Sequence, residues 1–122
     1  MLSRIHRLSG KDDFQRVFLK GERAATPFYT VRWRENALSV PRFGFVVANK
    51  ISKKATERNT IKRRLRECVR KNIVLCTSPV DVVIVVKQSA LGAKSALLEP
   101  EIVRTLSYIQ RRHTASRRDN KK

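Results

Sequence analysis

Three consecutive segments decide the fold: RFGFVVAN at residues 42–49, TERNTIKRRLRECVRKNIVL at residues 56–75, and VDVVIVVK at residues 80–87. The first is rich in β-branched and aromatic residues and predicts a strand. The second predicts a helix, which Thr56 is placed to cap. Its apolar face at helical spacing is formed by Ile61, Leu65, Cys68, Val69 and Ile73. The third is almost wholly apolar, as in a strand buried on both faces. Together they predict a β-α-β unit with two parallel strands.

The N-terminal side predicts a short helix over residues 11–20. Ser9 is placed to cap this helix and Gly21 to end it. Its aromatic stripe at i, i+3 and i+4 is formed by Phe14, Val17 and Phe18. A strand follows at residues 27–35, with its side chains alternating between the two faces. We expect this strand to run antiparallel to residues 42–49.

Two further segments complete the expected domain. A weaker strand signal covers residues 22–26, and residues 95–113 predict a last helix with Pro100 in its first turn. Residues 114–122 contain no apolar residue larger than alanine and are expected to form a basic flexible tail. We therefore expect one α+β domain over residues 1–113, in the order α-β-β-β-α-β-α, with a central mixed four-stranded sheet.

The chain carries far more positive than negative charge. Its 122 residues include 28 Lys and Arg against 10 Asp and Glu, a formal net charge of +18. Self-repulsion of this size opposes compaction unless a polyanion binds, so nucleic acid is the expected partner. The excess is greatest between residues 50 and 71, where only Glu57 and Glu67 oppose ten cations. These cations are Lys50, Lys53, Lys54, Arg58, Lys62, Arg63, Arg64, Arg66, Arg70 and Lys71.

Membrane insertion and secretion are not indicated. The longest apolar run, Val82–Val86, is far too short to span a bilayer, and the N-terminus lacks the apolar stretch of a signal peptide. We expect a cytoplasmic protein. Cys68 and Cys76 have no Cys or His neighbours at metal-ligand spacing and are expected to be buried or half-buried thiols.

The residue types do not predict an active site within the chain itself. Metal-dependent phosphodiester hydrolysis needs gathered carboxylates, whereas the acidic residues here are scattered. His6 and His113 lie near opposite ends of the chain, so a paired-imidazole site would require the fold to bring them together. No glycine-rich phosphate loop or nucleophile motif is present. We therefore expect no catalytic side chain, no metal ligand and no organic cofactor.

Two RNA-binding surfaces are expected instead. The first is a cationic helix face with Asn59 beside it, formed by Arg58, Lys62, Arg63, Arg66 and Arg70. Like charges at i, i+4 destabilise a helix by a few tenths of a kcal/mol per pair, which favours phosphate contact over simple solvation. The second is aromatic: Phe14 and Phe18, with Phe28 and either Phe43 or Phe45, could stack on exposed bases. The alternative, that these rings belong to the core, stays open at this stage.

These residues resemble the bacterial ribonuclease P protein component. GFVVANK at residues 44–50 and ATERNTIKRRLRE at residues 55–67 are similar to its signature, a short strand followed by Ala-x-x-Arg-Asn-Arg-x-Lys-Arg-x-x-Arg-Glu. Three further stretches agree in order and spacing: Asp13-Phe14 with Val17-Phe18, PRFG at 41–44, and DVVIV at 81–85. The resemblance covers about residues 8–112. It departs at Thr60, where the family has a second arginine, and at Asn49-Lys50, where a lysine pair is usual.

The resemblance implies a subunit of a ribonucleoprotein whose RNA cleaves precursor tRNA at its mature 5′ end. The RNA would hold most of the Mg²⁺, and one protein copy per ribonuclease P RNA is expected, with no membrane or DNA partner. The residues expected to contact the catalytic RNA are Lys50, Lys53, Lys54, Arg58, Asn59, Lys62, Arg63 and Arg66. The single-stranded 5′ leader would lie against Phe14, Phe18 and Arg32. The resemblance also implies a left-handed crossover between the parallel strands, against the usual rule and as in a domain of a small-subunit ribosomal protein.

Two other functions compete with this one. A ribosomal or other structural RNA-binding protein of similar α+β fold would share the length, charge and basic tail. An autonomous nuclease would cleave RNA without an RNA partner. The order Arg-Asn, Lys-Arg and Arg-Glu within residues 58–67 favours the ribonuclease P subunit, because a generic RNA binder has no need of it.

Overall fold

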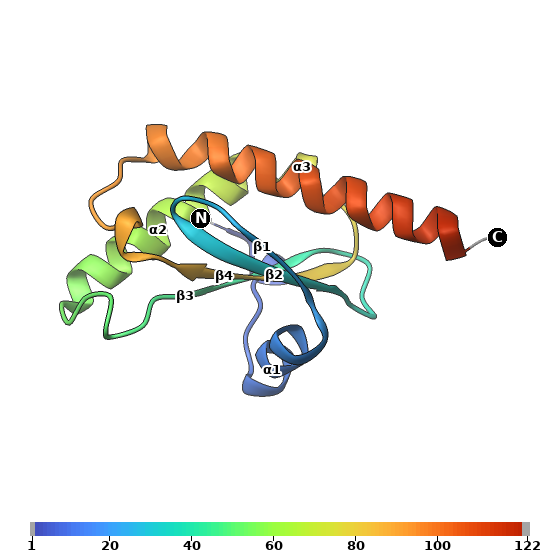
Figure 1. Cartoon of the computed structure of the whole chain (residues 1–122), viewed down its shortest axis with the longest axis horizontal. Helices are drawn as coiled ribbons and strands as arrows, with labels where there is room; N and C mark the ends of the chain where they lie inside the picture. Colours follow the sequence, from blue (N-terminus) through green and yellow to red (C-terminus); the bar gives the residue numbers. More distant parts are fainter. Residues whose placement is uncertain (1, 121–122) are drawn as a thin grey trace.

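The computed structural model describes the backbone of residues 2–120 and the side chains of residues 2–115. A twisted sheet forms the middle layer, with α2 and α3 on one face and α1 on the other (Figure 1). The helices are α1 (Lys11–Lys20), α2 (Ala55–Lys71) and α3 (Ser95–Asn120). The strands are β1 (Glu22–Ala25), β2 (Tyr29–Glu35), β3 (Arg42–Val46) and β4 (Val80–Val86). The expected α+β class and element order are confirmed.

The four strands lie in the order β1-β2-β4-β3. β3 pairs with β4 in parallel, with Gly44 opposite Val83, so the predicted β-α-β unit through α2 is confirmed. β2 is antiparallel to both β1 and β4. β3 therefore runs opposite to β2, as expected, but β4 lies between them. The apolar β4 takes the interior position because its side chains can be buried on both faces. The left-handed direction of the crossover stays a prediction.

The main core lies between the sheet and the pair α2 and α3. The alternation predicted for residues 27–35 is confirmed, since Tyr29, Val31 and Trp33 are buried on this side. The Tyr29 hydroxyl lies 2.6 Å from Thr105 Oγ1 on α3, and burial raises the pKa of this phenol. β2 thus meets α3 through apolar contacts and one satisfied polar pair.

Several predicted helix ends differ from the structure. The N-cap of α1 is Gly10 rather than Ser9, because the helix begins directly after the glycine. The N-cap of α2 is Lys54 rather than Thr56, whose carbonyl instead accepts a hydrogen bond from Thr60. α2 also ends at Lys71, earlier than the predicted residue 75. There the Asn72 side-chain amide donates to the Cys68 carbonyl and a short 3-10 turn follows.

The last helix is longer than predicted. α3 begins at Ser95 as expected but continues past His113 to Asn120, so the predicted tail is helical as far as that residue. Residues 114–120 contain neither Gly nor Pro, so nothing in the sequence breaks the helix. Residues 121–122 lie outside the described part of the chain. Figure 1 shows this end of α3 extending beyond the sheet. None of the described helices has the length and apolarity needed to cross a membrane.

Helix α1 lies very close to the other face of the sheet. A Cβ at position 44 would lie 2.9 Å from Phe14 Cε1 and closer still to Cζ, so only glycine leaves room for this ring on β3. At the other end of α1, a Cβ on Gly21 would lie 2.8 Å from the Trp33 carbonyl oxygen. A small second core fills the space between, built from Leu8, Val17 and Val83. The two glycines therefore set how deeply α1 sits.

We predict that Gly44→Ala destabilises the protein by about 1–3 kcal/mol, because the added methyl group overpacks the site under Phe14. Denaturant unfolding followed by circular dichroism measures this. In a Phe14→Ala background, where the ring is absent, the same substitution should cost clearly less. If Gly44→Ala lowers the free energy of unfolding equally in the two backgrounds, the destabilisation does not come from a clash with the Phe14 ring.

Candidate RNA-binding surfaces

The cations of α2 divide into those that hold the fold together and those left free. Arg58 donates to the Ser52 carbonyl at 2.8 Å, and Arg64 to the Ala93 carbonyl at 2.9 Å. Arg70 pairs with Glu67, and this hydrogen-bonded guanidinium holds the pKa of the Glu67 carboxyl at about 2. The cationic face predicted from the sequence is therefore only partly available to a ligand.

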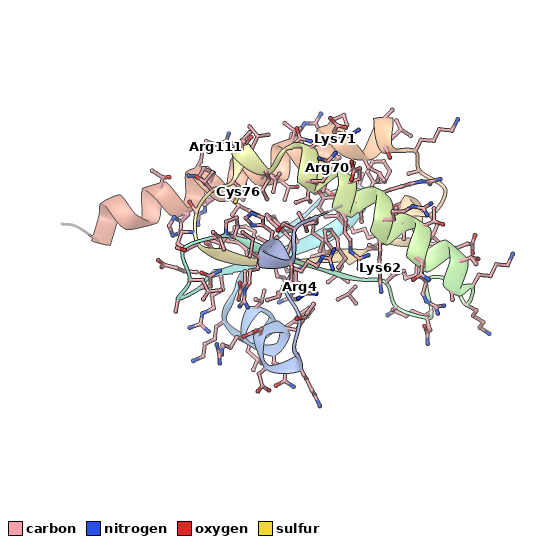
Figure 2. The ribbon with its side chains drawn as sticks, turned by 180° about the vertical axis from the view of Figure 1, so that it is seen from behind. Arg4, Lys62, Arg70, Lys71, Cys76 and Arg111 are labelled. Carbon is pink, nitrogen blue, oxygen red and sulfur yellow. The ribbon has the colours of Figure 1, made fainter. Side chains whose placement is uncertain are left out.

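Lys62 and Arg63 have no carboxylate or hydrogen-bond partner within the described part of the chain, and Arg63 is exposed. The Arg66 guanidinium lies 5.9 Å from the centre of the Phe45 ring, which places it along the β3 side of the helix. In Figure 2, Lys62 and Arg70 project from α2, and Arg4 of the N-terminal segment lies below them, toward α1. Arg4 was not among the predicted site residues.

The loop before α2 presents the lysines expected at the same surface. Lys50, Lys53 and Lys54 are all exposed, as is Asn59 in the second turn of the helix. The largely buried Ser52 holds this loop in place through two side-chain hydrogen bonds. Its hydroxyl donates to Glu57 at 2.6 Å and accepts from the Lys54 backbone N–H at 3.2 Å. The structure thus brings all of the predicted catalytic-RNA contacts onto α2 and its preceding loop.

The predicted leader contacts meet at α1. Phe18 is 38% exposed, and the Arg32 guanidinium lies 5.3 Å from the centre of its ring. Arg32 Nη1 also donates to the Phe18 carbonyl at 3.2 Å, so β2 and the end of α1 hold this arginine in place. Phe14 is half-buried against Gly44 and is mainly a packing residue with one accessible side.

The remaining aromatic candidates are core residues. Phe43 and Phe45 are buried on the opposite face of the sheet, under α2 and α3, and Phe28 packs against the same core. The hypothesis that Phe43 or Phe45 stacks on bases is wrong, whereas for the half-buried Phe28 it stays a prediction. The sequence showed that alternating strand residues point to opposite faces, but not that the odd-numbered face of β3 is the one that two helices cover.

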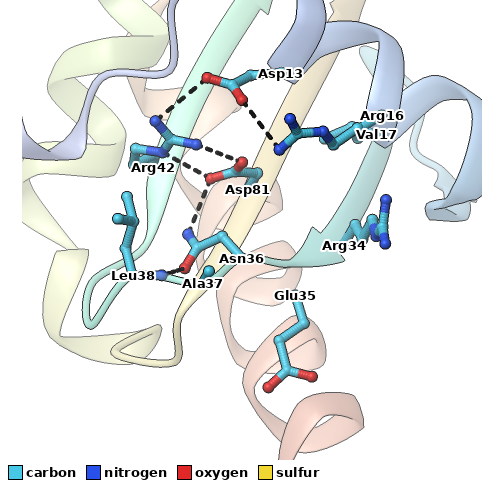
Figure 3. Close-up of a pocket in the computed structure, with 10 residues that line it drawn as sticks. All are labelled: Asp13, Arg16, Val17, Arg34, Glu35, Asn36, Ala37, Leu38, Arg42 and Asp81. Carbon is cyan, nitrogen blue, oxygen red and sulfur yellow. Dashed lines mark hydrogen bonds and ion pairs between the residues drawn. The ribbon is translucent and has the colours of Figure 1, made fainter.

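On one side of α1 there is a cavity of about 640 Å³ with an ion-pair network at its base (Figure 3). Arg42 donates to both carboxylate oxygens of Asp81, at 2.8 and 2.7 Å, and this bonding raises the pKa of Arg42. Asn36 donates to the same carboxylate at 2.9 Å, and Arg42 lies 3.5 Å from Asp13 on α1. Asp81 thus links β3, β4, the 36–40 turn and α1. Equal numbers of arginines and carboxylates line the cavity, so it has no net attraction for an anion.

Neither histidine forms part of a site. His6 Nδ1 lies 2.8 Å from the Pro41 carbonyl, and His113 lies 3.5 Å from Glu35, each held separately. Within the described residues, no group of three or more His, Cys, Asp or Glu side chains could hold a metal ion. Cys68 and Cys76 are buried free thiols, as expected, and burial raises the pKa of Cys76 to about 11.

The sequence matches the family model described as Ribonuclease P over residues 2–110. The chain belongs to the ribonuclease P protein family. A ribonuclease P protein component from Pectobacterium atrosepticum is 38% identical over 107 residues, which cover 88% of this chain and 86% of that protein. Another, from Pseudoalteromonas translucida, is 43% identical over 81 residues, or 66% of this chain. That match spans little more than half of the relative's length, 57%.

The fold is also that of a solved member of this family. The ribonuclease P protein from Thermotoga maritima superposes with a TM-score of 0.76 at 26% identity, covering 84% of this chain and 96% of that one. The resemblance drawn from residues 44–67 and the flanking stretches is therefore confirmed, together with the α+β fold.

Thr60 marks where this chain departs from the ribonuclease P protein signature. It lines a small cavity of about 250 Å³ together with Arg64, Leu91 and Gly92. Arg64 therefore covers the same side of α2 as Thr60, but its guanidinium is bonded to the Ala93 carbonyl. Arg64 cannot replace the missing cation without giving up that bond.

We predict that Asp81→Asn lowers the free energy of unfolding by about 2–4 kcal/mol, because the largely buried Arg42 loses its bidentate carboxylate and keeps only the longer contact with Asp13. Thermal and urea unfolding measure the loss. The matched control is Glu22→Gln, which removes the exposed ion pair with Arg112 and should change stability little. An Asp81→Asn variant as stable as this control would show that the network does not anchor α1.

Proposed function

We propose that this protein is the protein subunit of ribonuclease P and assists a catalytic RNA in removing the 5′ leader from precursor tRNA. The observation that carries the proposal is the set of uncompensated cations on α2 and its loop, within a chain of the ribonuclease P protein family. These cations have no internal carboxylate to neutralise them, so an external polyanion is needed. RNA backbone phosphates supply that charge.

In this function the protein binds and positions RNA while the RNA performs the cleavage. Among the described residues, no group of three or more acidic, His or Cys side chains is placed to hold a metal ion, which supports the proposal that Mg²⁺ is held mainly by the RNA. The free cations of α2 would neutralise phosphates of the ribonuclease P RNA, which we expect in a 1:1 complex. Holding the leader at α1 would broaden the range of precursor tRNAs processed. The complex would act in the cytoplasm.

The leader would lie beside α1, on the side away from the ion-paired cavity. There Phe18 of α1 lies against Arg32 of β2, and the sheet continues with the small or apolar side chains of Thr30, Val46 and Val85. An exposed ring beside a fixed guanidinium can stack on a base and contact a phosphate. A ribosomal or other structural RNA-binding protein would need the cationic surface of α2 but would have no need of a second surface at Phe18 and Arg32.

Reconstitution tests the proposal. At low Mg²⁺, we expect the purified protein to increase leader removal by a ribonuclease P RNA, because it supplies charge neutralisation that Mg²⁺ otherwise provides. The double variant Lys62→Ala/Arg63→Ala should reduce the slope of log affinity against log salt by about 1.4–1.8. The matched control, Arg104→Ala/Arg111→Ala, removes two charges from α3 and should leave the slope nearly unchanged.

The outcomes separate the three candidate functions. Cleavage by the protein without RNA would support an autonomous nuclease. Tight binding to ribosomal RNA with no gain in leader removal would support the structural alternative. An equal loss of slope in the α2 and α3 variants would mean that binding is unspecific attraction to a basic protein.

We predict that Phe18→Ala costs about 1–3 kcal/mol of leader affinity with little loss of stability, because the ring is partly exposed and free to stack. Phe14→Ala should instead reduce stability by about 2–3 kcal/mol, since its ring fills the space over Gly44. Titration with leader-bearing and leaderless tRNA, alongside urea unfolding, measures both effects. Loss of stability in Phe18→Ala without a leader-specific loss of affinity would assign Phe18 to packing.

A further inference from the structure

Two arginines face each other across β1 and β2 on the α1 side of the sheet. The register places Arg23 directly opposite Arg32, while the neighbouring pair Ala24 and Val31 points to the other face. Side chains opposed in this way have their Cβ atoms about 4.5–5.5 Å apart, and like charges at such positions are destabilising. The fold therefore keeps two positive charges close together at the edge of the sheet.

No carboxylate compensates this pair in the described part of the chain. Arg23 is exposed and has no hydrogen-bond or ion-pair partner there, and Arg32 bonds only a carbonyl and an aromatic ring. The adjacent Glu22 points to the opposite face, where it pairs with Arg112 at 2.7 Å. Asp13 on α1 is engaged with Arg16 and Arg42. Glu22 therefore lies on the other face of the sheet, and Asp13 is already paired, so neither carboxylate neutralises Arg23 or Arg32.

The pair also lies at one end of the surface proposed for the leader. Phe14 lies over Gly44 on β3 and Phe18 over Arg32 on β2, so α1 crosses the sheet from β3 toward the β1 side. A strand of RNA following α1 in this direction leaves the protein at β1, the edge strand opposite β3. Arg23 is the cation at this exit.

We infer that Arg23, together with Arg32, binds a backbone phosphate of the leader beyond the nucleotide that contacts Phe18. This inference rests on the proposed function and adds the position at which the leader leaves the protein. The guanidinium forks suit phosphate oxygens, and Arg32 is already held in place by Phe18. A phosphate between the two arginines would neutralise the repulsion between their guanidinium groups.

The test uses the reconstituted complex and a series of precursor tRNAs whose leaders are lengthened one nucleotide at a time. Arg23→Ala should leave affinity unchanged for mature tRNA and for leaders too short to reach β1. For longer leaders we expect a loss of about two- to fivefold at low salt, and a salt slope smaller by about 0.7. Arg23→Lys keeps the charge and should recover much of the loss.

The matched control is Arg111→Ala, which removes an equally exposed and unpaired charge from α3, on the opposite face of the sheet. It should show no dependence on leader length. An unchanged affinity for long leaders in Arg23→Ala would overturn the inference. An equal loss for all substrates, mature tRNA included, would also overturn it, because Arg23 would then contact the catalytic RNA or the tRNA body. A wild-type protein that gives no leader-dependent affinity would instead overturn the proposed function.

Discussion

The close approach of α1 to the sheet at Gly44 is the constraint that sets the position of this helix and therefore the contacts of the residues on both of its sides. Because position 44 has no side chain, the Phe14 ring can lie directly on β3 and bring the helix down with it. The helix then runs across the strands until Phe18 reaches Arg32. A helix held further from the sheet would leave Arg32 without its carbonyl and ring contacts. The single hydrogen atom at position 44 therefore determines whether an exposed ring and a fixed guanidinium occur side by side.

The surfaces on the two sides of α1 differ in charge, so they differ in how well they can bind an anion. On one side, Asp81 binds Arg42 and Asn36, and Asp13 adds a second carboxylate, so positive and negative groups cancel. Such a buried network contributes orientation more than stability, because desolvation offsets most of the attraction. On the other side, Arg32 and Arg23 have no acid at all within the described residues. This difference supports the proposal that an anionic strand lies on the side of Arg32 and Arg23.

The sequence predicted the features that repeat along the chain and missed those that depend on distant partners. Helical spacing gave α2 and its apolar face, and the uninterrupted apolar run gave β4 as a central strand. The position of β4 between β2 and β3 was not predictable in this way, because the local pattern of each strand is the same for any order of the strands in the sheet. The cap of α2 was placed at Thr56, whereas Ser52 in the loop organises this end through Glu57.

The same limit applies to the binding surfaces. Residue type pointed to the cations of α2 as a group but could not separate those without a partner from those bonded to backbone carbonyls. Four phenylalanines on α1 and β3 looked equivalent as stacking candidates, yet two of them lie beneath α2 and α3. Which rings are accessible depends on which sheet face two helices cover, and that is decided by packing across the whole chain.

Sorting the cations by their contacts changes how the charge of this protein should be interpreted. Arg58 and Arg64 are tied to the carbonyls of Ser52 and Ala93, so removing either loosens a loop as well as removing a charge. An affinity loss in such a variant would combine a structural and an electrostatic effect. Lys62 and Arg63 have no such bonds, and their substitution reports on the RNA contact alone. The exposed loop lysines belong with them. The surface offered to phosphate is therefore smaller than the charge count of residues 50–71 implies, and it consists of the loop lysines together with Lys62, Arg63 and Arg66 of α2.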